Sequence, residues 1–291
     1  MKISVVVCTY NRCDDLRIAM QSLMLQDFPA SDYEILIVDN NSTDRTKDVV
    51  LEFPHVRYLL EEKIGLSYAR NRGIEESQGE IIAFIDDDAR AEKTWLSVLN
   101  NVYKEEKDIG CVGGRVMLDW VAPKPTWWQP ELDEVFNGIN YSDAGTVLSY
   151  PQVPYGTNIS YKAGVFHEIG FFGTELGRIG TKLLAGEETE LCLRIEKKGY
   201  KIFYKPEAIV YHRVEPDKLT KSYIRKRAIW HGRSHAMIEL KHFGHSYARE
   251  KAINNFKDVC RWVRTLRYSI VEQKKYYFKF GYFLQVIMPR S

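Results

Sequence analysis

The first hundred residues alternate short apolar runs with segments whose apolar residues recur every three or four positions. The runs predict strands buried on both faces, at 3–8, 34–39, 56–60 and 81–86. The segments between them predict amphipathic helices, including helices over about 66–77 and 94–104. Strands that alternate with helices in this way indicate a parallel sheet built from βαβ units.

The periodicity weakens after about residue 111 and returns only in parts. The stretch 119–150 is rich in proline and tryptophan, and loops of this length are usually functional or mobile. Helix and strand signals resume at 163–170, 187–198 and 200–212, and residues 219–291 have the pattern of basic helices. We therefore expect an α/β fold, with a doubly wound, mostly parallel, Rossmann-like sheet over 1–217 and a helical extension over 218–291.

Length and composition agree with one large domain and an extension. The chain has 291 residues, of which 45% are hydrophobic and 27% charged. No apolar stretch reaches the roughly 18 residues of a membrane span, and no N-terminal signal pattern is visible. The five cysteines form no CxxC pair, which argues against a zinc site or a disulfide framework and favours a cytoplasmic location.

The net charge of +2 hides an asymmetry between the two parts of the chain. From Lys218 onward there are 17 basic and 4 acidic residues, whereas the preceding residues hold the remaining 24 and 35. A basic, aromatic extension suits an anionic membrane surface or nucleic acid. The alternative is a solvated face on ordinary surface helices.

The sequence IIAFIDDD ends a buried strand on three carboxylates, Asp86, Asp87 and Asp88. Two other predicted strands also end in polar clusters, at residues 9–12 and 39–42, and in a parallel sheet these ends share one edge, where ligands bind. Adjacent carboxylates repel one another, and Mg²⁺ or Mn²⁺ relieves that repulsion. Because extended residues alternate in direction, Asp86 and Asp88 are predicted to face the metal and Asp87 to point away. The alternative is a solvated acidic turn.

Glycine-rich phosphate-binding loops are absent from the sequence. No GxGxxG follows the first strand and no GxxxxGK[ST] occurs, so a nucleotide is expected to bind through a metal. A second acidic patch opens the predicted helix near 187, where Glu188 heads an apolar stripe and becomes a candidate general base. The alternative is that Glu187 and Glu188 only cap this helix. His212, at the end of the next strand, is a candidate metal ligand, although a lone histidine is more often structural.

Together these segments resemble family 2 glycosyltransferases, inverting enzymes of the GT-A fold that use nucleotide sugars, over about residues 3–214. The resemblance rests on six motifs in order: VVVCTYNR, IVDNNSTD, GLSYARNRGI, AFIDDD followed by Trp95-Leu96, YGTNIS, and GEETELCLRI through AIVYH. It implies a GT-A catalytic domain over 1–217, with a nucleotide-binding half over about 1–110 and an acceptor half over about 111–217.

The resemblance also implies roles for particular residues. The donor-binding set comprises Thr9, Tyr10, Asn11, Arg12, Asp39, Asn41, Arg70, Asp86 and Asp87. In this set Asp39 is similar to the acid that contacts the base or ribose, and Arg70 to the basic residue near the uracil and phosphates. Asp86 to Asp88 resemble the DxD motif, with Asp88 as the direct metal ligand, and His212 is similar to a histidine that completes the metal shell in some members. Glu188 matches the general base.

Two departures from the family pattern bear on these roles. The common Asp-Asp-Gly-Ser is Asp39-Asn40-Asn41-Ser42 here, which alters the predicted base or ribose contacts. The common Glu-Asp pair is Glu187-Glu188, so either glutamate remains a candidate for the base.

The implied activity is an inverting transfer of a sugar from a nucleotide-diphosphate donor, expected to be a UDP-sugar, to a hydroxyl of a saccharide or lipid-linked glycan, with Mn²⁺ or Mg²⁺. Trp127 and Trp128 are candidate acceptor-stacking residues, with core packing as the alternative, and Asn158 from YGTNIS joins them on the acceptor side. The family's frequent acceptors favour an anionic membrane over nucleic acid as the partner of the basic extension, and so a place at the inner face of the cell membrane.

Two other functions stay open from the sequence. A nucleotidyltransferase also uses a divalent metal and paired carboxylates, but it needs a basic phosphate-binding loop after the first strand, where only Arg12 stands. A non-catalytic protein of the same fold would bind sugar nucleotides without consuming them. The sequence does not indicate the donor sugar, the linkage or the oligomeric state.

Overall fold

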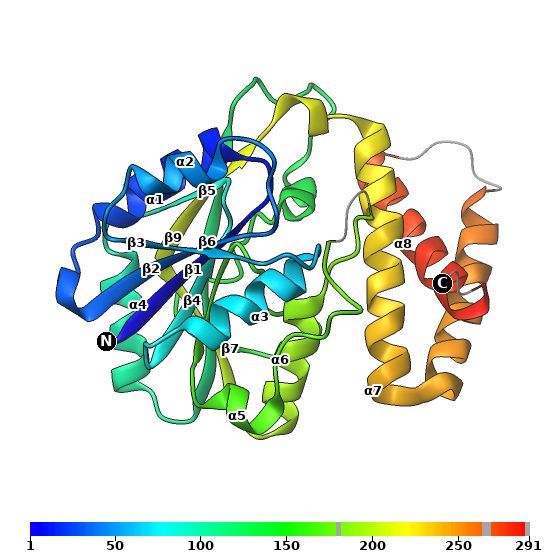
Figure 1. Cartoon of the computed structure of the whole chain (residues 1–291). Coiled ribbons are helices and arrows are strands. Elements are labelled where there is room, and N and C mark those ends of the chain that lie inside the picture. Colours follow the sequence, from blue (N-terminus) through cyan, green and yellow to red (C-terminus); the bar gives the residue numbers. More distant parts are fainter. Residues whose placement is uncertain (179–181, 264–268, 289–291) are drawn as a thin grey trace. The chain divides into compact units, whose positions relative to one another are not determined.

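The computed structural model describes residues 1–178, 182–263 and 269–288, and the chain divides into two compact units (Figure 1). Unit 1 is formed by Met1–Asp119, Asn137–Thr174 and Glu187–Arg213. Unit 2 is formed by Trp120–Phe136, Glu175–Gly186 and Val214–Ser291. Unit 2 thus takes two segments from the middle of the chain in addition to its C-terminal part. The division of 1–217 into a nucleotide-binding and an acceptor half stays a prediction.

Four parallel strands form one side of the sheet of unit 1, in the order β3-β2-β1-β4. Ile3 pairs with both Tyr33 and Ile81, so β1 lies between β2 and β4. All four predicted strands are confirmed: β1 (Ile3–Thr9), β2 (Tyr33–Asp39), β3 (Val56–Leu60) and β4 (Ile81–Ile85). Because they run in the same direction, their carboxyl ends share one edge of the sheet.

The rest of the sheet is antiparallel, and here the structure differs from the expected mostly parallel arrangement. β8 pairs antiparallel with β4 and with β6, and β9 pairs antiparallel with β5 and β7. The apolar pattern of a strand carries no direction, which is why the sequence did not reveal this. The strands are β5 (Ala89–Ala91), β6 (Ile109–Trp120), β7 (Thr146–Leu148), β8 (Asn158–Lys162) and β9 (Lys201–Val214).

Helices pack on both faces of this sheet, because successive side chains of each strand point to opposite faces. In β1, Ile3, Val5 and Val7 join a core with α1, α2 and α4, whereas Val6 joins a second core with α3, α5 and α6. The α/β fold class is confirmed. The helices are α1 (Cys13–Met24), α2 (Thr46–Leu51), α3 (Leu66–Glu76), α4 (Trp95–Glu105), α5 (Val165–Ile169) and α6 (Glu187–Lys197), with a short 3₁₀ turn, η1 (Ala30–Asp32).

Unit 2 contains the predicted C-terminal helical extension, formed by α7 (Lys221–Val263) and α8 (Ile270–Ile287). Gly244 has φ 85° and ψ 170° and interrupts α7. Figure 1 shows the chain turning back there, so α7 consists of two arms, 221–243 and 245–263. Two 3₁₀ helices, η2 (Pro130–Phe136) and η3 (Pro216–Lys218), complete the elements of this unit. Within the described part of the chain, no helix combines the length and apolar character needed to cross a membrane.

Two glycines let α7 and α8 approach each other closely. A Cβ atom at Gly232 would lie 2.0 Å from the carbonyl oxygen of Phe278, and one at Gly281 would lie 2.0 Å from that of Ile229. Backbone atoms cannot yield as a flexible side chain can. The packing of this helical pair therefore requires glycine at both positions.

We expect Gly281→Ala to lower the free energy of unfolding by about 1–3 kcal/mol, because the added methyl group forces the helices apart. In an ordinary helix interior, replacing glycine by alanine stabilises the folded protein by roughly 1 kcal/mol. A loss of stability in this variant would therefore indicate the close helix packing. Urea denaturation followed by circular dichroism measures it. The control is Gly164→Ala, since nothing lies within 4 Å of a Cβ there and the φ of −59° suits alanine. Equal urea midpoints for the Gly281 variant and the unmodified protein would contradict the close packing.

Candidate active site

Three acidic residues follow β4 directly at the edge where the parallel strands end. Asp86, Asp87 and Asp88 precede β5, and β9 brings His212 opposite Ala89, the first residue of β5. Thr9, the last residue of β1, donates a hydrogen bond from Oγ1 to Oδ2 of Asp87 at 2.8 Å. Strand pairing thus gathers side chains from the three sequence segments at 9, 86–88 and 212.

Asp86, Asp88 and His212 form a group that fits a divalent cation. Each offers a ligand atom, and these atoms all lie within 4.8 Å of one another. Nε2 of His212 is 3.1 Å from Oδ1 of Asp88. Two carboxylates and an imidazole suit Mn²⁺, and the carboxylates also suit Mg²⁺. Asp87 bonds instead to Thr9 and Arg12, outside the cation group. The expected extended backbone is not found, because residues 86–89 form a turn in which the amide of Ala89 donates to the carbonyl of Asp86 at 3.2 Å.

Arg12 neutralises part of the negative charge. One of its guanidinium nitrogens lies 3.1 Å from Oδ1 of Asp87 and 2.5 Å from Oδ2 of Asp88. Burial raises the pKa of Asp87 to about 7, although Arg12 opposes the rise and Asp88 adds to it. Burial alone would lower the pKa of Arg12, but the two carboxylates raise it above its ordinary value. The three carboxylates at this edge therefore carry more negative charge than Arg12 neutralises.

Arg70 is buried next to this edge and contacts two acidic residues. Its side chain is 4% exposed, forms an ion pair with Glu187 and lies 3.8 Å from Oδ1 of Asp86. The guanidinium also lies 5.5 Å from the centre of the Phe172 ring. A Cβ atom at Gly156 would come within 1.9 Å of it, so glycine there makes room for the arginine. The donor contact predicted for Arg70 stays a prediction, whereas its buried ion pair was not foreseen.

Glu187 and Glu188 open α6 as expected, and both are buried. The predicted stripe is confirmed, since Leu191, Cys192 and Ile195 are buried with Glu188. Among the residues that the structure describes, Oε2 of each glutamate is buried without a hydrogen-bond partner. Burial raises the pKa of Glu188 to about 8, the charge of Glu187 raises it further, and Arg70 opposes both. A carboxyl group with this pKa exchanges a proton near neutral pH, as a general base must.

The remaining donor-binding candidates lie on the loops after β1 and β2. Tyr10 is 48% exposed, while the side-chain oxygen of Asn11 accepts a hydrogen bond from the backbone of Thr43 at 2.7 Å. Both oxygens of Asp39 are engaged, one by the backbone of Ser42 at 2.8 Å and one by the hydroxyl of Tyr58 at 2.8 Å. Asn11 and Asn41 have positive φ angles of 54° and 66°. These contacts order the two loops, and the donor roles stay predictions.

Sequence reasoning did not single out Thr157 as a site residue. Its hydroxyl donates to Oδ2 of Asp86 at 2.5 Å and accepts from the amide of Asn137 at 2.9 Å. It is fully buried, and it orients Asp86 toward the other ligand candidates. Its position within the YGTNIS motif was the available signal.

The three acceptor candidates have structural contacts. Asn158 is 1% exposed, and its amide bonds to the indole of Trp95 and to two backbone carbonyls. Trp127 and Trp128 belong to unit 2, where Trp128 packs 4.9 Å from Trp120 and 5.4 Å from Phe136 between ring centres. These contacts favour the packing alternative for Trp128, and an acceptor role for the three residues stays a prediction.

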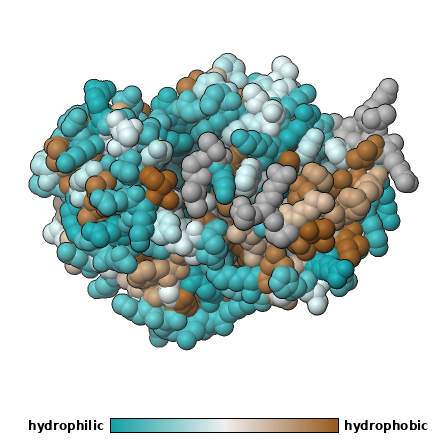
Figure 2. Space-filling model, turned by 45° about the vertical axis from the view of Figure 1, so that its right-hand side comes forward, coloured by the Kyte–Doolittle hydropathy of each residue, from teal (hydrophilic) through white to brown (hydrophobic). Residues whose placement is uncertain are grey.

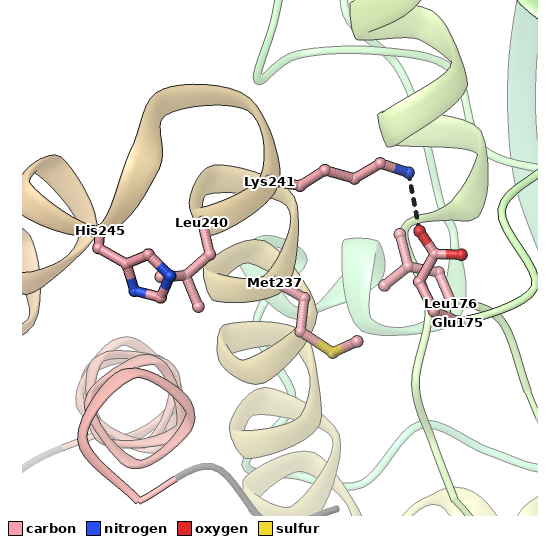
Figure 3. Close-up of a pocket in the computed structure, with 6 residues that line it drawn as sticks. All are labelled: Glu175, Leu176, Met237, Leu240, Lys241 and His245. Carbon is pink, nitrogen blue, oxygen red and sulfur yellow. Dashed lines mark hydrogen bonds and ion pairs between the residues drawn. The ribbon is translucent and has the colours of Figure 1, made fainter.

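A pocket of about 340 Å³ occurs within unit 2 (Figure 3). Figure 3 shows Leu176, Met237 and Leu240 lining it, with Lys241 bonded to Glu175 at 2.8 Å beside them. None of the predicted site residues lines it. Glu175 is the one carboxylate among the described residues that line it, so it lacks the acidic cluster of the candidate active site.

Comparisons with known proteins show which family and which folds this chain resembles. The family model described as glycosyl transferase family 2 matches residues 4–170. The chain is 34% identical over 246 residues to the glucosyl-dolichyl phosphate glucuronosyltransferase of Haloferax volcanii, covering 82% of this chain and 78% of the relative. The fold of this chain is similar to that of the Pyrobaculum calidifontis mannosyltransferase PcManGT in complex with GDP-Man and Mn²⁺. The TM-score is 0.63 at 15% identity, and the match covers 100% of this chain and 88% of PcManGT. The fold is also similar to that of S. aureus TarS 1–349 in complex with UDP-GlcNAc, with TM-score 0.58, 19% identity and coverage of 99% and 82%.

If Asp86, Asp88 and His212 bind a cation, excess Mn²⁺ should raise the melting temperature by about 5 °C, the shift that a hundredfold excess over Kd gives a protein of this size. Asp88→Asn should abolish this increment, whatever its effect on the metal-free protein. Thermal denaturation with and without Mn²⁺ measures the increment. Asp143→Asn is the matched control, because Asp143 is an exposed carboxylate bonded to Arg115 outside the cluster. A full increment in the Asp88 variant would exclude this site.

Proposed function

Because the chain belongs to glycosyl transferase family 2, we propose that it transfers a sugar from a nucleotide-diphosphate donor to a hydroxyl group of a lipid-linked glycan, with inversion. The observation that carries the proposal is the connection between two acidic groups. Arg70 joins them, lying 3.8 Å from Asp86 of the cation group and pairing with Glu187 beside the candidate base, Glu188. The cation group suits binding of the departing diphosphate, and the glutamate pair suits removal of a proton from the acceptor.

The donor would bind at the edge formed by the ends of β1, β2 and β4. Asp86, Asp88 and His212 would hold Mn²⁺ or Mg²⁺, which when bound neutralises charge on the departing diphosphate. Thr9 and Arg12 hold Asp87, and Thr157 holds Asp86, so these carboxylates keep their orientation before any donor arrives. Asp39, Asn11, Asn41 and the exposed ring of Tyr10 would contact the nucleoside. A UDP-linked donor is the first to test, since the TarS complex contains UDP-GlcNAc, and a GDP-linked donor is the second, since the PcManGT complex contains GDP-Man.

Glu188 would remove the proton of the acceptor hydroxyl. Its Oε2 atom is buried without a hydrogen-bond partner in the described part of the chain, so it is available to accept a proton. The hydroxyl oxygen then forms a bond to the anomeric carbon as the bond to the diphosphate breaks on the opposite face. This single displacement inverts the anomeric centre, and an α-linked donor gives a β-linked product. Glu187, paired with Arg70, would position Glu188 and adjust its pKa.

The acceptor is proposed from similarity. The relative from Haloferax volcanii is named for a glucosyl-dolichyl phosphate acceptor and a glucuronosyl transfer, and this chain covers 78% of it. We therefore propose a saccharide carried on a polyprenyl-type phosphate as the acceptor, and a uronic acid sugar as the first donor to test. Release of a nucleoside diphosphate distinguishes this reaction from a nucleotidyltransferase, which releases pyrophosphate.

We expect Glu188→Gln to lower kcat about 10²- to 10⁴-fold, the usual contribution of a general base, while the KM for the donor changes little. Steady-state assays of UDP release with a glucosylated polyprenyl phosphate measure both constants. Glu105→Gln removes an exposed carboxylate at the end of α4 and should retain full activity. Turnover by the Glu188 variant at the unmodified rate would assign the base elsewhere.

The pH dependence of kcat/KM follows from the raised pKa of Glu188 in the ligand-free protein. The base acts when deprotonated, so kcat/KM should rise about tenfold per pH unit below pH 8 and level off above it. Glu187→Gln removes a charge that raises this pKa, so the midpoint should move to lower pH. Arg70→Met removes a charge that lowers it, so the midpoint should move to higher pH. If Glu187 were the base, its variant would lose turnover instead of shifting the profile.

A further inference from the structure

The second arm of α7 exposes a stripe of apolar side chains. Ile253, Phe256 and Val263 are 43%, 42% and 62% exposed, and Cys260 between them is also exposed. These positions are spaced by three, four and three residues, so they lie on one side of the helix. The buried residues Ala248, Ala252 and Val259 lie on the neighbouring face of the helix. The arm is therefore apolar on the side facing its own unit and also along part of its solvent side.

The stripe continues onto α8 through ring contacts. The rings of Phe256 and Phe283 stack with centres 4.4 Å apart and planes 21° apart. Trp262 also stacks on Tyr276, with ring centres 5.0 Å apart and planes 15° apart, but it projects about 180° round the α7 arm from Ile253 and lies outside the stripe. Near the end of α8, Ile287 and Met288 are 41% and 59% exposed. Figure 2 shows apolar residues, in brown, gathered over the helices of unit 2.

Basic residues border this apolar surface. Over the described residues 245–263 and 269–288 there are seven Lys or Arg and three Asp or Glu. Arg249 and Lys257 are exposed beside Ile253 and Phe256 on the α7 arm, and Lys275 is exposed on α8. Asp258, one of the three acids, is bonded to Lys279 and lies 3.6 Å from Arg261. The surface is consequently apolar in its middle and mostly positive at its margin, where exposed Glu250 also lies one turn before Ile253.

We propose that this helical surface, defined by Ile253, Phe256, Val263, Ile287 and Met288, docks on an anionic lipid bilayer. The apolar side chains would enter the boundary between headgroups and acyl chains. Arg249, Lys257 and Lys275 would contact lipid phosphates. The helices would lie along the membrane plane, since no described helix can cross it.

The charge and the side-chain types select a bilayer over other occupants. A second copy of the chain would place the same basic margin against itself, which like-charge repulsion disfavours. Single-stranded nucleic acid needs exposed aromatic faces for base stacking, but the most exposed residues of the stripe are Val263 and Met288. The inference builds on the proposed lipid-linked acceptor, because a bilayer-bound enzyme meets such an acceptor in two dimensions.

Co-sedimentation of the full chain with lipid vesicles tests the inference. We expect binding to phosphatidylglycerol vesicles and little binding to pure phosphatidylcholine, with binding to the former weakened by salt. The variant Ile253→Asp/Val263→Asp should lose at least about tenfold in partitioning. Lys257→Glu should lose about fivefold or more, the effect of one basic residue near an anionic surface. Leu51→Asp is the matched control, because Leu51 is a 67% exposed apolar residue on α2 of unit 1.

Each outcome decides the inference. Equal binding of the stripe variant and the Leu51 variant would overturn it, as would a dimer in solution that the stripe variant dissociates. Circular dichroism establishes that the variants remain folded. Transfer to a short-chain, water-soluble acceptor separates this inference from the proposed function. There the stripe variant should match the unmodified protein, whereas an unmodified protein that binds vesicles but transfers no sugar would refute only the proposed function.

Discussion

Negative charge at the carboxyl end of β4 is the constraint on which the rest of unit 1 depends. Three consecutive carboxylates at a buried sheet edge repel one another. Burial raises the pKa of Asp87 to about 7, and the charges of Asp88 and Asp86 add to that rise. Arg12 precedes α1 and Arg70 lies within α3, yet both contact carboxylates of this edge. Their charges hold the carboxylates in place, and a bound cation would further relieve the repulsion between Asp86 and Asp88.

The fold supplies this arrangement through strand pairing. The parallel order β3-β2-β1-β4 brings the loops after β1 and β2 to the edge where Asp86 begins. The antiparallel half of the sheet then adds what a fully parallel sheet would lack, because β9 carries His212 alongside β5 and the segment before β8 carries Thr157. Both the parallel and the antiparallel strands are therefore needed to complete the site.

Arg70 illustrates how one buried cation can serve two groups. It pairs with Glu187, lies near Asp86 and opposes the rise in the pKa of Glu188. A charge buried this deeply is tolerable only with partners, and removing one partner leaves the other uncompensated. The state of the proposed base and the orientation of the acidic cluster are thus physically coupled, although the residues are far apart in the sequence.

The sequence by itself determined the positions of β1 to β4, the helical extension and the residue types of the candidate site. These follow from local signals: apolar periodicity sets the elements, and polar residues at strand ends mark the ligand edge. Only the tertiary structure decided the antiparallel half of the sheet, the Arg70–Glu187 ion pair and the burial of Asn158 and Thr157. Strand direction and side-chain partners depend on contacts between distant segments, and the local pattern of a segment does not encode its partners.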